Sequence, residues 1–121
     1  MSVNSFRDLG VWQAGKDLVE EIYRLRQTFP PQEAYGLTSQ MRRAAISVPS
    51  NIAEGHAREH SKVYLHHISM AQASLAELQT QMEIAGRLRY LQLDMVNISL
   101  AQAISLSKQL HALRNALTKR D

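Results

Sequence analysis

Residues 40–55 read Gln40-Met41-Arg42-Arg43-Ala44-Ala45-Ile46-Ser47-Val48-Pro49-Ser50-Asn51-Ile52-Ala53-Glu54-Gly55 and decide the fold of this 121-residue chain. Apolar residues recur at positions 37, 41, 45, 48 and 52, which is the spacing of one helical face. Pro49 has no N–H and crowds the preceding turn, so the sequence predicts a helix that kinks or breaks there. Gly55 suits the left-handed position that closes many helices, so we expect this helix to end at Glu54.

The same periodicity extends outward into three further segments. Asp8 is a candidate N-cap for the first helix, which must end before Pro30, and Ser61 is a candidate N-cap for the third. Short connections between long helices favour an all-α, antiparallel up-down-up-down four-helix bundle in a single domain, residues 1–121. The predicted helices span residues 8–29, 37–54, 61–90 and 94–119.

Composition narrows the class of protein. The chain has no cysteine, so disulfides and thiolate metal sites are excluded. Five glycines and three prolines are too few for a β-rich fold with many turns. Residues 1–5 lack the apolar run of a signal peptide, and no segment resembles a membrane span. We therefore expect a cytoplasmic protein without a membrane partner.

Acidic residues near the apolar faces suggest a structural pair. If the second and third helices form a hairpin around residues 56–60, Arg43 lies opposite residues 73–77 of the third helix. The sequence therefore predicts a partly buried ion pair between Arg43 and Glu77, which would fix the register of the two helices. A catalytic role for the carboxylates would require two of them to converge in one pocket.

Histidines offer the other candidate chemistry. His56 and His60 are four residues apart, a spacing that can chelate zinc, and Glu59 could assist them. The sequence lacks a complete ligand set, a nucleophile elbow and a phosphate-binding glycine loop. We therefore expect no metal, no cofactor and no enzymatic activity.

The basic residues are candidates for phosphate contacts. The net charge is +3, and the C-terminal part of the chain is richer in basic than in acidic residues. Few aromatic residues accompany them, so any binding should be to the nucleic-acid backbone. Arg42 and Arg58 are second choices, because the segment around Pro49 could need them for packing. The alternative role of all these basic residues is to keep the protein soluble. The candidate nucleic-acid-binding residues are Arg87, Arg89, Arg114, Lys119 and Arg120.

Several short motifs resemble a known family. Residues 40–58 are similar to the signature of the four-helix-bundle family encoded in intervening sequences of bacterial 23S ribosomal RNA genes. Arg89 stands where that family often has a glycine. Further similarity is carried, in the same order as in the family, by Phe6-Arg7-Asp8-Leu9, Val11-Trp12-Gln13, Phe29-Pro30, Tyr35-Gly36-Leu37 and Glu77-Leu78-Gln79-Thr80-Gln81.

The resemblance implies partners. A related branch, the accessory variability protein of diversity-generating retroelements, works beside a reverse transcriptase on RNA and DNA. The resemblance thus implies a ring-like homo-oligomer, specifically a pentamer, that associates with RNA or DNA and with a nucleic-acid enzyme such as a reverse transcriptase. A protein–protein scaffold without nucleic-acid binding remains the alternative. Apolar residues available for self-association are Trp12, Ile46, Ile98 and Ile104.

Overall fold

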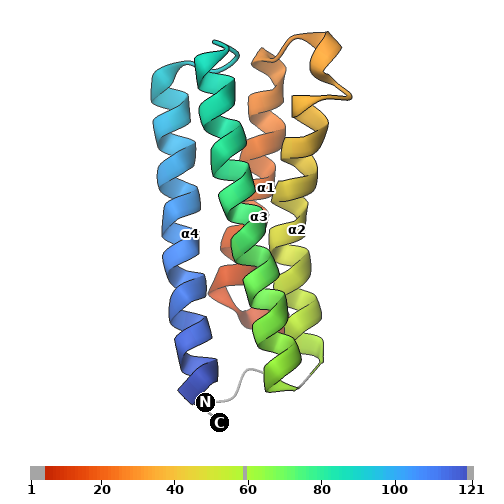
Figure 1. The fold of residues 1–121 in the computed structure, drawn as a ribbon, viewed down its shortest axis with the longest axis vertical. Helices are drawn as coiled ribbons and strands as arrows, with labels where there is room; N and C mark the ends of the chain where they lie inside the picture. Colours follow the sequence, from red (N-terminus) through yellow and green to blue (C-terminus); the bar gives the residue numbers. More distant parts are fainter. Residues whose placement is uncertain (1–4, 59, 120–121) are drawn as a thin grey trace.

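The computed structural model describes residues 5–58 and 60–119, and within them the chain forms four α-helices and no strand (Figure 1). Three short 3-10 helices precede or follow the first long helix: η1 (Phe6–Asp8), η2 (Arg26–Thr28) and η3 (Pro31–Glu33). The predicted all-α class is confirmed. The long helices are α1 (Gly10–Leu25), α2 (Leu37–Ala57), α3 (Ser61–Arg87) and α4 (Leu93–Lys119).

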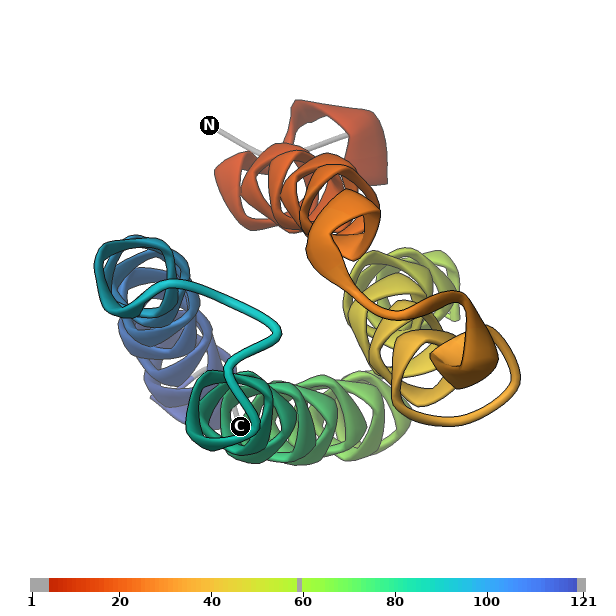
Figure 2. The ribbon, with the colours of Figure 1, turned by 90° about the horizontal axis from the view of Figure 1, so that it is seen from above.

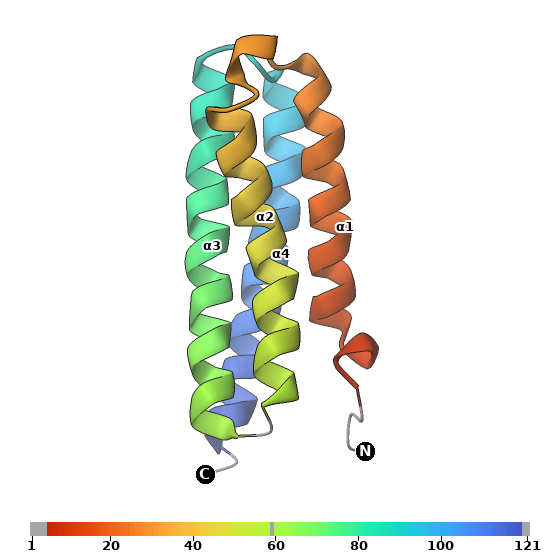
Figure 3. The same ribbon diagram turned by 90° about the vertical axis from the view of Figure 1, so that its right-hand side faces the viewer.

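The four helices lie side by side, and the chain turns back at the ends of the bundle (Figures 1 and 3). Viewed along the bundle, α1 faces α3 across the centre, with α2 and α4 at the other two corners (Figure 2). This arrangement is compatible with the expected up-down-up-down order. None of the described helices combines the length and apolar character that crossing a membrane requires.

The predicted helical faces form the core. Every residue of one face of α3 is buried, and Ile22 and Leu25 of α1 belong to the same buried core. On α4, Leu100 and Leu113 are only partly buried, while Val96, Ala103, Leu106, Leu110 and Leu117 are buried. The fully buried α3 face consists of Tyr64, Ile68, Ala71, Leu75, Leu78, Met82 and Ala85.

Two predicted helix caps are wrong. Ser5 caps the short η1 helix by accepting a hydrogen bond from the Arg7 N–H, and Asp8 ends that helix. The extended backbone of Leu9 then separates η1 from α1, so α1 begins at Gly10 without a side-chain cap. At α3, the N-cap residue is His60 and Ser61 is already helical, again without a side-chain cap.

α2 continues through both of its predicted interruptions. Pro49 lies inside a helix that extends to Ala57, so the predicted break is wrong, whereas a kink remains a prediction. Pro49 packs against α1, where a Cβ on Gly15 would lie 3.3 Å from the Pro49 Cβ. Gly55 is buried inside α2 with a negative φ, so its predicted role as a left-handed helix end is also wrong.

Side chains connect the two loops at one end of the bundle. The Thr28 hydroxyl donates to the Tyr90 carbonyl at 2.7 Å, and the Phe29 and Tyr90 rings pack with centroids 5.4 Å apart. The Tyr90 hydroxyl donates to Glu33 Oε2 at 2.9 Å. This hydrogen bond raises the pKa of the Tyr90 phenol, because deprotonation would break the bond and place two negative charges together. The contacts tie the α1–α2 connection to the α3–α4 connection.

Candidate nucleic-acid interface

The structure separates the predicted nucleic-acid-binding residues into two groups. Arg87 and Arg89 lie where α3 ends, whereas Arg114 and Lys119 lie near the end of α4, at the opposite end of the bundle (Figure 1). The 27 residues of α4 span roughly 40 Å at 1.5 Å per residue. The candidate residues of one chain therefore lie toward two different ends of the bundle. Arg120 lies outside the described residues.

Two further basic residues join Arg114 and Lys119. Arg58 is the C-cap of α2, and Lys62 lies in the first turn of α3, so both lie at the end of the bundle where α4 ends (Figure 1). The side chains of all four residues are exposed. We call Arg58, Lys62, Arg114 and Lys119 the basic end. Sequence reasoning ranked Arg58 second because of its possible packing role. It left Lys62 out of the site because Lys62 is far from Arg114 and Lys119 in the sequence.

The charges of the basic end lack neutralising partners among the described residues. Within that part of the chain, the ion pairs shorter than 4.0 Å are Arg24 with Glu21 and His67 with Glu54. Arg114 Nη1 donates instead to the neutral amide of Gln72 on α3, at 3.3 Å. This bond orients Arg114 without cancelling its charge, so its remaining donors can serve a phosphate.

A polar network between α2 and α3 supports this end of the bundle. The amide of the buried Asn51 donates to both the carbonyl and the hydroxyl of Ser47, each at 2.9 Å. The Asn51 Oδ1 can only accept, so His67 donates to it through Nδ1 at 2.9 Å. Ser74 donates to the Ser47 hydroxyl, also at 2.9 Å. The network satisfies these partly buried groups and links the two helices that carry Arg58 and Lys62.

The predicted Arg43–Glu77 pair does not form. Both side chains are exposed, and no ion pair joins them in the part of the chain that the structure describes. Glu77 accepts a hydrogen bond from Gln81, four residues later on its own helix. Hydrogen bonds of Asn51 with His67 and of Ser47 with Ser74 instead join α2 to α3.

Three histidines, His56, His66 and His67, contact neighbouring rings. His56 packs edge-on against the Tyr64 ring with centroids 5.7 Å apart, and His66 lies beside His67 at 5.9 Å. Among the described residues, no group of three or more histidine, aspartate or glutamate side chains could hold a metal ion. Glu59, the predicted helper of His56 and His60, lies outside the described residues.

Fold and site together define a small all-α protein with exposed basic side chains, without ion-pair partners among the described residues, in one half of the bundle. The family model of the 23S rRNA-intervening sequence protein matches residues 7–112. Because this match covers most of the 121 residues, the chain belongs to the 23S rRNA-intervening sequence protein family. No curated protein matches the chain.

Proposed function

We propose that the protein is a non-enzymatic, cytoplasmic homo-oligomer that binds the phosphate backbone of RNA or DNA through its basic end. The observation that supports this proposal most directly is that Arg58, Lys62, Arg114 and Lys119 are exposed in the same half of the bundle and have no acidic partner among the described residues. Their exposed side chains could reach phosphates without any rearrangement of the core.

Binding of this kind should be weakly sequence-selective. Lysine and arginine contacts to phosphate release condensed counterions, so affinity falls steeply as salt rises. Stacking of bases requires exposed aromatic rings, and Tyr64, the aromatic residue nearest this end of α3, is buried. The proposed partner is therefore recognised by charge and by the spacing of its phosphates.

Self-association would strengthen nucleic-acid binding, although the net charge of one chain is small. A net charge of +3 attracts a polyanion feebly, but a ring would repeat the basic end in every subunit. Later contacts along one nucleic acid then form at high effective concentration. A pentamer is the stoichiometry that the family resemblance implies, and a nucleic-acid enzyme such as a reverse transcriptase is the protein partner that the related branch suggests.

The test compares two triple variants by fluorescence anisotropy with labelled RNA and DNA at two salt concentrations. Lys62→Ala, Arg114→Ala, Lys119→Ala removes three charges from the basic end. We expect affinity to fall at least tenfold and the slope of log Kd against log salt to decrease by about three, because about three phosphate contacts are lost.

The matched control is Arg24→Ala, Arg87→Ala, Arg89→Ala, which removes the same charge from the other end of the bundle. This variant should bind with a salt slope close to that of the wild type. An equal loss of RNA and DNA affinity in the two variants would show that binding depends only on net charge and not on the basic end. Absence of binding by the wild type at low salt would reject the proposal.

The second candidate function is a protein–protein scaffold. It is favoured by exposed apolar side chains on the helices, among them Leu93 at 74% and Ile98 at 60% exposure. Apolar side chains on a surface often mark a site of association with another protein. The same anisotropy experiment separates the two candidates, since a pure scaffold would leave RNA and DNA unbound at both salt concentrations.

A further inference from the structure

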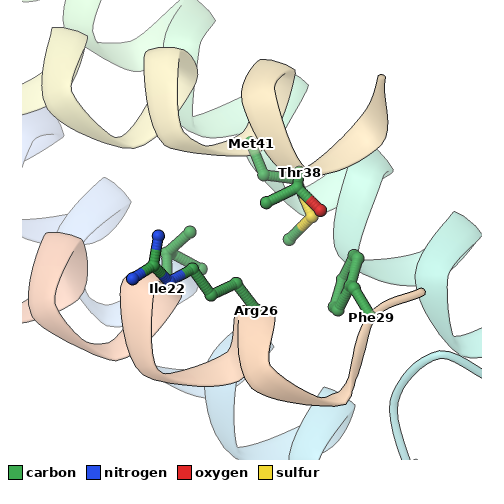
Figure 4. A pocket seen from close by; sticks show the side chains of 5 residues that line it. All are labelled: Ile22, Arg26, Phe29, Thr38 and Met41. Atoms are coloured by element: carbon green, nitrogen blue, oxygen red, sulfur yellow. The ribbon is translucent and has the colours of Figure 1, made fainter. Parts of the chain in front are cut away.

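A hollow lies between α1 and α2, at the end of the bundle opposite the basic end. It has a volume of about 200 Å³ and is lined by residues of η2, of the rest of the connection to α2 and of the first two turns of α2. It adjoins a crevice too narrow to admit water, with Ile22 and Met41 among its lining residues (Figure 4). We call the wider space the α1–α2 hollow.

Two arginines line the α1–α2 hollow from opposite helices. Arg26 follows α1 and Arg42 lies in the second turn of α2. Their guanidinium carbons lie 5.8 and 5.5 Å from the centroid of the same ring, that of Tyr23. Contact with the same ring restricts both side chains, and both residues line the hollow.

The described part of the chain supplies no acid to neutralise this pair. Neither Arg26 nor Arg42 has a carboxylate within 4.0 Å there. The nearby Glu33 is engaged elsewhere, because one of its oxygens accepts from the Leu37 N–H and the other from the Tyr90 hydroxyl. Glu21 pairs with Arg24 at 2.7 Å. Among the described residues, the two arginines that line the hollow are therefore not neutralised, and an anion there would relieve the repulsion between their like charges.

Thr38 adds a neutral donor to the same hollow. It is 8% exposed, lines both the hollow and the crevice, and lies in the first turn of α2. A hydroxyl at this position can donate to an oxyanion. The amino end of a helix also favours negative charge, which adds to the attraction of the two guanidinium groups.

We propose that the α1–α2 hollow is a phosphate-binding site, in which Arg26 and Arg42 hold the oxygens of a phosphoryl group and Thr38 donates a third hydrogen bond. Planar guanidinium groups match phosphate geometry in a bidentate manner, which favours a phosphoryl group over a halide ion. The site lies at the other end of the molecule from the basic end and does not depend on the proposed nucleic-acid binding.

The remaining walls suggest what is attached to the phosphate. Phe29, Pro31 and Ala34 also line the hollow and present apolar surface beside the arginines. A volume of about 200 Å³ is several times the roughly 30 Å³ that one water occupies in the liquid. The hollow is therefore larger than the oxygens of one phosphate group require. A phosphate monoester could therefore place its organic part against these walls, whereas inorganic phosphate would use only the cationic side.

The experiment titrates the full-length protein with inorganic phosphate and, separately, with uridine 5′-monophosphate, at constant ionic strength maintained with chloride. Amide chemical shifts of the wild type should change saturably at Ala34, Thr38 and Arg42 with phosphate and remain unchanged with chloride alone. Tighter binding of the monophosphate would identify a monoester site, and equal affinity would identify inorganic phosphate as the complete ligand.

The variants are Arg26→Gln and Arg42→Gln, with Arg24→Gln as the matched control that removes an equal charge from the same region. We expect each of the first two to weaken binding at least about tenfold, and the control to change it little, because a charge-assisted hydrogen bond is lost only in the former. Circular dichroism checks that each variant is folded.

Two results would overturn the inference: no saturable shifts in the wild type with either ligand, or equal weakening by Arg24→Gln and Arg42→Gln. Since the shift mapping uses the wild type, it remains decisive even if a variant fails to fold. Loss of RNA binding in the basic-end variant would not affect this result, so the two proposals can fail separately.

Discussion

At the scale of single residues, Gly55 shows how one missing side chain sets the distance between two helices. A Cβ at this position would lie 2.8 Å from the His67 Cβ and 3.0 Å from Tyr64 Cδ1. The His67 Cβ is held close to the α3 backbone, so it cannot move away without shifting the helix. Gly55 therefore permits the close approach that brings His67 to the Asn51 amide.

Gly55→Ala should lower the free energy of unfolding by about 1–2 kcal/mol. Overpacking a tight contact costs roughly 1–3 kcal/mol, and the better helix propensity of alanine returns up to about 1 kcal/mol. The control is Gly10→Ala, where a Cβ would meet nothing within 4 Å. Thermal unfolding at one protein concentration measures both variants. An unchanged Tm for Gly55→Ala would mean that α2 and α3 separate without cost.

At the scale of helices and their ends, the end of α3 contains an unusual backbone conformation. Arg89 has a φ of 64°, the left-handed region, and is the one non-glycine residue with positive φ in the described part of the chain. The Tyr90 N–H donates to the Ala85 carbonyl and the Arg89 N–H to that of Gly86, which is the Schellman pattern of a helix end. The glycine that the family often has here would adopt this conformation without strain.

Arg89→Gly should therefore stabilise the protein, by about 0.5–1 kcal/mol, because it relieves the Cβ strain at a left-handed position. Arg87→Gly is the matched control. It lies in the last turn of α3 with helical backbone, so the same change should destabilise by up to about 1 kcal/mol. Denaturant unfolding of the two variants should shift in opposite directions. A loss of stability in both would contradict the proposed role of the left-handed residue.

The helices were predictable from the sequence because each has a long apolar face of period 3.6. The predicted and observed spans of α3 and α4 differ by at most three residues at any end. Helix ends were harder, since local rules for glycine and proline do not include tertiary contacts. Pro49 is tolerated inside α2, where it packs against Gly15 of α1, and Gly55 fits the close contact of α2 with His67 of α3. Gly15 and His67 are both far from these positions in the sequence.

At the scale of the whole molecule, the candidate sites depend on which helix ends meet. Arg87 and Arg114 seemed alike in the sequence, since both have few acidic neighbours, but the fold places them at opposite ends of the bundle. Lys62 and Lys119 are far apart in the chain and belong to the same end. The α1–α2 hollow gathers Arg26 and Arg42 in a similar way. Such groupings follow from topology and require the structure.

The outer surface also contains an apolar stripe along α3, which consists of Val63, Met70, Ile84 and Leu88. All four side chains are exposed, and with 3.6 residues per turn they return to about the same side of the helix. Glu77 interrupts the stripe midway.

Of the apolar residues expected to mediate self-association, Ile98 and Ile104 of α4 are exposed, whereas Trp12 is partly buried against the core. Apolar surface on two different helices is what a cyclic assembly requires, because each subunit presents one patch to each neighbour.

If the α3 stripe mediates assembly, a charge in its centre should prevent it. Wild-type protein is expected to have a mass by light scattering of about five times the 13.7-kDa chain, as the family resemblance implies. Met70→Lys would bury an unpaired ammonium group at the interface, so we expect the mass to fall to that of a monomer. Tyr35→Lys is the control, since Tyr35 is 99% exposed in the α1–α2 connection and lies outside the stripe. A monomeric wild type, or a Met70→Lys protein as large as the wild type, would contradict this interface. In the latter case, Ile98 and Ile104 would be the next positions to substitute.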